Sequence, residues 1–198
     1  MALETEIKLI GVDHAALLEA LRKARARRLW RAFEQNLVFD DPARSLAARS
    51  VLLRLRDGAG GARLTLKRPV PEAEGSEFKV YDEIESGVSD FESVRALLEA
   101  LGYPVAFAYE KVREKWRMGD VFICLDRLPF GEFVELEGPQ DDVLACLARL
   151  GCEKALRSKE TYHALNAADR RARGLPEQEG FVFEPAERAR LLQELASE

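Results

Sequence analysis

Histidine and cysteine are scarce in this sequence, which has 2 and 3 of them among 198 residues. His14 and His163 are too far apart along the chain to suggest a histidine metal cluster, so a metal site would need oxygen ligands. The cysteines are odd in number and lack the spacing of a zinc site. We interpret them as reduced thiols, which is typical of a cytosolic protein.

Long hydrophobic runs and an excess of positive charge are also missing. No apolar run approaches a membrane span, and the start, MALETEIKLI, lacks the features of a signal peptide, so we expect a cytoplasmic protein without a membrane segment. The 30 Lys and Arg residues against 35 Asp and Glu leave a net charge of −5, which argues against a nucleic-acid binder. Charged residues nevertheless make up 33% of the chain, above the ordinary quarter or so, so their distribution matters more than their sum.

Strand and helix patterns alternate along the chain. Alternating apolar residues predict strands at 4–10, 29–38, 51–56, 63–67, 77–85, 107–117, 121–126 and 132–137. Helices are predicted at 13–26, 90–101, 139–150, 159–173 and 185–197, with Asp13 as an N-cap and Gly102 and Gly151 as stop signals. About eight strands between helices indicate an α+β fold with a mostly antiparallel sheet.

One face of nearly every predicted strand is fully charged. Residues i and i+2 share a face of a strand, so the pleat groups these side chains. The groups are Glu4, Glu6 and Lys8; Arg54 and Arg56; Arg63, Thr65 and Lys67; Glu83 and Glu85; Lys111 and Arg113; and Glu135 and Glu137. Either these faces lie in water on a half-exposed sheet, or the eight strands close into a barrel and the charges line its interior.

The recurrence of sign-segregated pairs favours the closed eight-stranded antiparallel β-barrel, with the helices packed outside. Enclosed charges must be neutralised, because burying an unpaired ion is costly. Carboxylate clusters can hold Mg²⁺ or Mn²⁺, and Lys and Arg can bind phosphate oxygens. A polyanion that bridges metals, such as a triphosphate, fits both needs.

The segment ETEIK at 4–8 resembles the E-x-E-x-K signature of the CYTH superfamily, the triphosphate tunnel metalloenzymes. Later segments are similar to further strands of that family, in the right order: LRLR at 53–56, LTLKRP at 64–69, FAYEKVR at 107–113, ICLD at 123–126, GEFVELE at 131–137 and the pair Thr161-Tyr162. The run from 101 to 135 looks most like the bacterial class IV adenylate cyclase branch. Tyr81 and Asp82 depart from the pattern, since many relatives carry an Arg there.

The resemblance implies a triphosphate tunnel domain at 1–166, with 167–198 as a C-terminal helical extension. It implies a metal site formed by Glu4, Glu6, Glu83, Glu85, Asp126, Glu135 and Glu137. The implied triphosphate ligands are Lys8, Arg54, Arg56, Lys67, Lys111, Arg113 and Lys159. Catalytic roles fall to Lys8, Glu6 and Asp126.

Three functions share this site. The first is hydrolysis of an inorganic or organic triphosphate (tripolyphosphate, ATP or thiamine triphosphate) with Mg²⁺ or Mn²⁺, which we favour because it asks only for triphosphate and water. The second is class IV adenylate cyclase activity, which converts ATP to cyclic AMP and pyrophosphate. The third is an inactive polyphosphate- or nucleotide-binding module. We expect a monomer or homodimer that binds neither nucleic acid nor membranes.

Overall fold

The computed structural model describes residues 2–70 and 78–198, with residues 2–4 described by their backbone only. Within these residues there are nine strands: β1 (Ala2–Ile10), β2 (Arg27–Phe39), β3 (Leu52–Asp57), β4 (Ala62–Pro69), β5 (Lys79–Val88), β6 (Val105–Met118), β7 (Val121–Leu128), β8 (Gly131–Glu137) and β9 (Leu156–Ser158). The helices are α1 (His14–Lys23), α2 (Ser45–Ala48), α3 (Phe91–Ala100), α4 (Gln140–Leu150), α5 (Tyr162–Ala172) and α6 (Pro185–Ala196).

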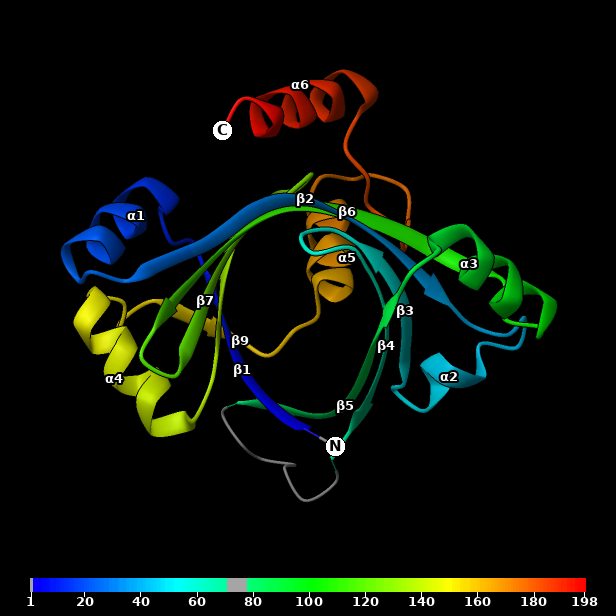
Figure 1. Cartoon of the computed structure of the whole chain (residues 1–198), viewed down its shortest axis with the longest axis horizontal. Coiled ribbons are helices and arrows are strands. Elements are labelled where there is room, and N and C mark those ends of the chain that lie inside the picture. The colour runs from blue at the N-terminus through cyan, green and yellow to red at the C-terminus, as the bar shows by residue number, and fades with distance from the viewer. Residues whose placement is uncertain (1, 71–77) are drawn as a thin grey trace.

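Eight antiparallel strands close into a barrel, which confirms the predicted fold (Figure 1). The strands follow the order β5-β4-β3-β2-β6-β7-β8-β1, and β1 pairs with β5 to close the ring. At the closure Glu6 lies opposite both Glu137 of β8 and Lys79 of β5. The short strand β9, which was not predicted, pairs with β1 beyond this point, where Ile10 lies opposite Leu156.

Apolar side chains cover the outer face of the barrel, and residues of α1, α3 and α4 pack against them. These three helices lie outside the ring of strands (Figure 1). Ile123 and Val134, on neighbouring strands, are both fully buried in the core cluster under α1 and α4. Asp13 caps α1 as predicted, since its carboxylate accepts the backbone N–H of Ala15 at 2.8 Å. Among the described residues, no helix has the length and apolar character to cross a membrane.

The structure differs from the sequence prediction at two helices. The helix predicted at 90–101 has apolar residues at Val94, Leu97, Leu98 and Leu101, a set that should face the core. Only part of this set meets the barrel, because Leu97 and Leu101 are 61% and 71% exposed while Val94 packs inward. The short helix α2 lies between two predicted strands, where the sequence pattern predicts no helix. Its four residues are too few to show a periodic pattern, and the buried carboxylate of Asp40 holds its first turn by accepting backbone N–H groups.

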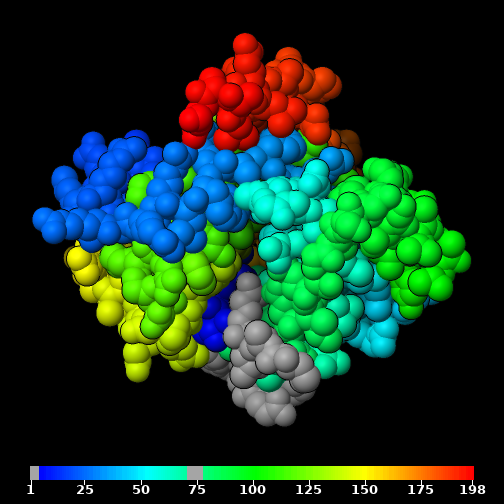
Figure 2. All heavy atoms as spheres, in the orientation of Figure 1, coloured from blue at the N-terminus to red at the C-terminus, as the bar shows by residue number. Residues whose placement is uncertain are grey.

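The C-terminal residues form part of the barrel wall. Strand β7 pairs with β6 only from residue 112 onward, so the first half of β6 has one edge left over. The segment around Phe181 covers that edge: the N–H of Glu110 donates to the carbonyl of Phe181 at 2.9 Å, in a parallel bridge. Helix α6 then crosses the outer face of β2 as a separate ridge (Figure 2). Its own residue Leu191 is fully buried.

Glu110 anchors this segment, and Glu110→Ala is expected to destabilise the protein by about 2–3 kcal/mol. Glu110 is 4% exposed, and its carboxylate accepts both the N–H of Phe183 at 3.1 Å and the Nε–H of Arg188 at 2.8 Å. The shift in the urea unfolding midpoint measures the effect. Glu184→Ala is the matched control, because Glu184 is exposed and makes no side-chain cap to α6. Equal midpoints for the two variants would contradict the anchoring role.

Candidate active site

A cavity of about 600 Å³ lies inside the barrel and is lined from most of its strands. The predicted charged faces turn inward, as the alternation along the strands requires. The predicted site residues that line the cavity are Glu6, Lys8, Arg54, Arg56, Lys67, Glu83, Glu85, Lys111, Arg113, Glu135 and Glu137. Lys159 is exposed and is not among the lining residues, and the side chain of Glu4 falls outside the described residues.

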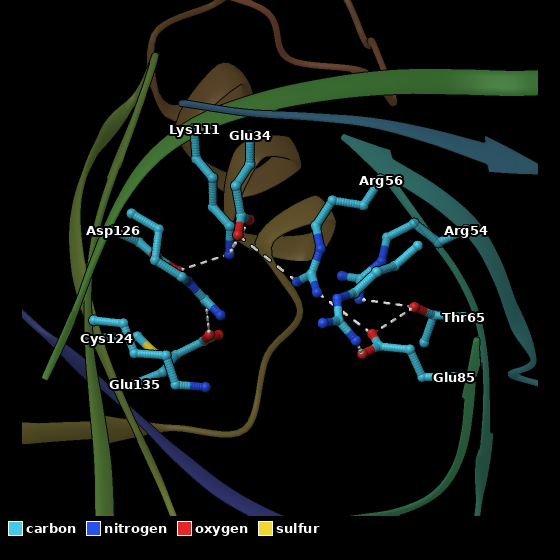
Figure 3. Close-up of polar contacts among 12 residues, drawn as sticks. Glu34, Arg54, Arg56, Thr65, Glu85, Lys111, Cys124, Asp126 and Glu135 are labelled. Atoms are coloured by element: carbon cyan, nitrogen blue, oxygen red, sulfur yellow. Dashed lines mark hydrogen bonds and ion pairs between the residues drawn. The ribbon is translucent and has the colours of Figure 1, made fainter. Parts of the chain in front are cut away.

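Asp126 forms the centre of one charged group in the interior (Figure 3). Its carboxylate is fully buried and accepts from Lys111 Nζ at 3.0 Å, Arg113 Nε at 2.6 Å and the hydroxyl of Tyr162 at 2.8 Å. Burial raises the pKa of Asp126, but Arg113 and Lys111 outweigh it and hold that pKa below its ordinary value. Asp126 therefore stays ionised and fixes two cations on β6.

Glu135 links this group to β1. Its carboxylate accepts from Lys8 Nζ at 2.9 Å and from the guanidinium of Arg113. Burial raises the pKa of Glu135, yet the cations of Lys8 and Arg113 bring it well below the usual range. The register explains the contact with Lys8, because Lys8 and Glu135 lie opposite each other on paired strands.

Glu6, Glu135 and Glu137 form an acidic cluster in which one oxygen of each lies within 4.8 Å of the others. Burial and the neighbouring Glu135 carboxylate raise the pKa of Glu6. A divalent cation would offset this repulsion, and carboxylate oxygens are the ligands that Mg²⁺ and Mn²⁺ prefer. The donor set of the cluster therefore fits the metal ion that the sequence led us to expect.

Two other predicted carboxylates, Glu83 and Glu85, contact cations. Glu85 accepts from Arg56 at 3.4 Å and from Arg63 at 2.9 Å, and Glu83 pairs with Lys67 at 2.7 Å. Arg54, Arg56 and Glu85 face the Asp126 group across the interior (Figure 3). Of the seven predicted metal ligands, the structure thus brings three together, within the part of the chain whose side chains are described.

Several residues of the barrel interior were not assigned a role from the sequence. Glu34 is 1% exposed and lies 3.6 Å from Lys111 and 3.7 Å from Arg56, so it joins the two charged groups (Figure 3). Its strand had no assigned face, because that face mixes Glu34 with neutral residues. Lys79, Tyr109 and Lys115 line the cavity. Each continues the i, i+2 alternation of a predicted charged face, so the sequence contained the signal for them.

Lys79 and Tyr81 occupy the inner face of β5, where the family pattern leads one to expect an Arg near residue 81. Burial and the neighbouring Lys8 cation lower the pKa of Lys79 to about 8, and its Nζ lies 4.0 Å from Glu6. Tyr81 lines the cavity, while Asp82 is on the opposite face and accepts from Arg68 at 2.7 Å. Lys79 therefore provides a cation on the inner face of β5, where Tyr81 stands near the position of the expected Arg.

The cavity has a surplus of positive charge over negative. Its lining includes nine Lys and Arg residues and six Glu residues. Several of the cations are already held by carboxylates, which fixes their positions before any ligand binds. Such a preorganised cationic cavity suits a small polyanion, and the acidic cluster suits a metal that would bind with it.

Comparisons with known proteins agree with this architecture. Residues 2–150 match the model of the CYTH domain family. A candidate adenylate cyclase of Methanocaldococcus jannaschii, MJ0240, is 28% identical over 142 residues, which cover 71% of this chain and 79% of that protein.

Solved structures show the same fold. The Pyrococcus horikoshii protein PH1012 aligns with a TM-score of 0.68 at 21% identity, over 80% of this chain and 96% of that one. The Hippeastrum protein HpAC1, described as an adenylyl cyclase candidate with a dominant triphosphatase activity, aligns with a TM-score of 0.63 at 18% identity, over 90% and 99% of the two chains. Because the family model matches most of the chain and the closed barrel is the fold of these relatives, this protein belongs to the CYTH domain family.

Proposed function

We propose that this protein binds a triphosphate inside the barrel and hydrolyses it with the help of Mg²⁺ or Mn²⁺. The observation that carries the proposal is the combination, in one cavity, of a cationic surplus with the acidic cluster Glu6, Glu135 and Glu137. The cations attract the phosphates, and the cluster provides the oxygen ligands that a divalent ion needs.

The phosphate oxygens would be bound by cations from several walls of the barrel. The proposed ligands are Lys8, Arg54, Arg56, Lys67, Lys111 and Arg113, and Lys159 is proposed to contact the substrate at its exposed position. Glu6, Glu135 and Glu137 would hold the metal, which when bound polarises phosphate oxygens and offsets their charge. Asp126 would act by holding Lys111 and Arg113 in place, a role supported by its three contacts.

The remaining predicted ligands, Glu4, Glu83 and Glu85, would tune the site. Glu83 and Glu85 keep Lys67 and Arg56 oriented towards the cavity. We also propose that 167–198 is an extension that completes the cavity wall, a view supported by the bridge between Phe181 and Tyr109.

Adenylate cyclase activity is the second candidate, supported by the name of the Methanocaldococcus relative. Cyclisation needs a site for the base as well as for the phosphates. Aromatic residues at one end of the cavity, Phe107 and Tyr109, offer such a surface.

Product analysis distinguishes the candidates. Purified protein is incubated with ATP or with tripolyphosphate, plus Mg²⁺ or Mn²⁺, and a Glu6→Ala variant serves as the control. We expect orthophosphate from the wild type and none from the variant. Cyclic AMP and pyrophosphate from ATP would establish the cyclase in its place. If the protein bound the substrate but formed no product, it would be an inactive triphosphate-binding module.

A further inference from the structure

The inner face of strand β6 changes from aromatic to positively charged residues along its length. Its inward residues are Phe107, Tyr109, Lys111, Arg113 and Lys115, and all of them line the cavity. With a strand rise of about 3.3 Å per residue, Tyr109 and Lys115 are roughly 20 Å apart along β6. One strand therefore runs from an aromatic end, past three cations, to the acidic cluster, where Lys115 Nζ lies 3.3 Å from Glu137.

The aromatic end is built from three separate parts of the chain. The ring of His163, on α5, meets Phe107 with centroids 4.5 Å apart and Tyr109 with centroids 5.3 Å apart, both edge to face. Leu52, at the start of β3, lines the same end. Burial lowers the pKa of His163 to about 4, so its ring is uncharged at neutral pH. Such a surface suits a flat and largely apolar group and offers little to a phosphate.

Arg44 provides the polar edge of this end. Its guanidinium carbon lies 5.6 Å from the centroid of Phe107, and Glu179 holds the group at 2.7 Å. A guanidinium stacks well on a neutral aromatic ring and repels a cationic one. The aromatic end is therefore better suited to a neutral base than to a positively charged ring such as that of thiamine.

We propose that Phe107, Tyr109 and His163 bind the neutral aromatic base of a nucleoside triphosphate while its phosphates lie along Lys111 and Arg113. The protein then prefers a nucleoside triphosphate to inorganic tripolyphosphate. This inference rests on the proposed function, since it assumes that the cationic part of the cavity binds the triphosphate.

The test compares dissociation constants for ATP and for tripolyphosphate, measured by calorimetry with Ca²⁺ in place of Mg²⁺ to slow turnover. Phe107→Leu is expected to weaken ATP binding about tenfold, the scale of one lost base–aromatic stack, and to leave tripolyphosphate binding within about twofold. His163→Ala should show the same asymmetry, which keeps the test informative if Phe107→Leu folds poorly. Phe130→Leu is the control, because Phe130 packs on Phe133 and Phe181 and is not among the lining residues.

Each outcome decides a separate question. Weaker binding of ATP alone in both variants supports the base site. Equal effects on the two ligands, or no effect on either, would overturn the base site while the triphosphate site stands. If the wild type bound neither ligand, the proposed function itself would fall, and the base site with it.

Discussion

Replacing Glu137 with glutamine is expected to lower the rate of phosphate release from tripolyphosphate by about 10³-fold, because the acidic cluster loses one of its three charges. The substitution keeps the size of the side chain and the neighbours of residue 137, among them Lys115 at 3.3 Å. The loss should therefore appear in kcat and in the Mn²⁺ concentration needed for half-maximal rate, with little change in melting temperature.

Glu132→Gln is the matched control for this experiment. Glu132 lies on the same strand, β8, but on its outer face, where the side chain is 50% exposed and its carboxylate lies 3.7 Å from His14. The same chemical change at this position should leave the rate and the Mn²⁺ dependence at wild-type values. If the Glu137→Gln variant behaved like this control, Glu137 would not be a ligand of the proposed metal site.

Asp126→Asn is expected to have the largest effect on stability, a loss of about 3–5 kcal/mol in the free energy of unfolding. The carboxylate is fully buried and accepts from Lys111, Arg113 and Tyr162, so the change leaves two buried cations short of a counter-charge. Urea unfolding at pH 7 measures the loss. Asp120→Asn is the control, because Asp120 lies in the turn between β6 and β7, the strands that carry Lys111, Arg113 and Asp126. Its side chain is 74% exposed and should contribute less than about 0.5 kcal/mol to the free energy of unfolding.

The wild type and the Asp126→Asn variant should also differ in how their stability changes at acid pH. The folded-state pKa of Asp126 is lowered from an ordinary value of 3.8, so the unfolded chain binds the proton more readily than the folded one. Its contribution to stability is therefore complete above about pH 4 and is lost as the pH falls through the lowered pKa. Below about pH 4 the wild type should lose stability more steeply than Asp126→Asn. Parallel curves would show that Asp126 is not paired in solution.

The strand faces were predictable from the sequence because a pleated strand permits only one alternation. Once Arg54 and Arg56, or Glu135 and Glu137, were assigned to one face, the apolar residues between them had to face the helices. Where a strand had a mixed face, as around Glu34, no prediction was made. The pattern also could not show β9 or α2, which are too short for a periodic signal.

The alternation along the strands could not predict which carboxylates cluster together and which pair with cations. The sequence predicts seven metal-ligating carboxylates. In the structure Glu85 pairs with Arg63 and Asp126 pairs with Lys111, and both lie outside the cluster of Glu6, Glu135 and Glu137. Which carboxylates cluster depends on the register between strands that are distant in sequence. Pairing of β1 with β8 brings Glu6 and Glu137 face to face across more than a hundred residues.

The sequence by itself thus determined the closed antiparallel barrel, its charged interior and the family, since local alternation and an ordered set of short motifs are properties of the chain. Only the tertiary structure decided which three carboxylates lie close enough to share a metal ion and which cations line the cavity. It alone also brought His163 against Phe107 and placed Phe181 on the edge of β6. The physical reason is that coordination and stacking act over a few ångströms, and closure of the barrel sets those distances.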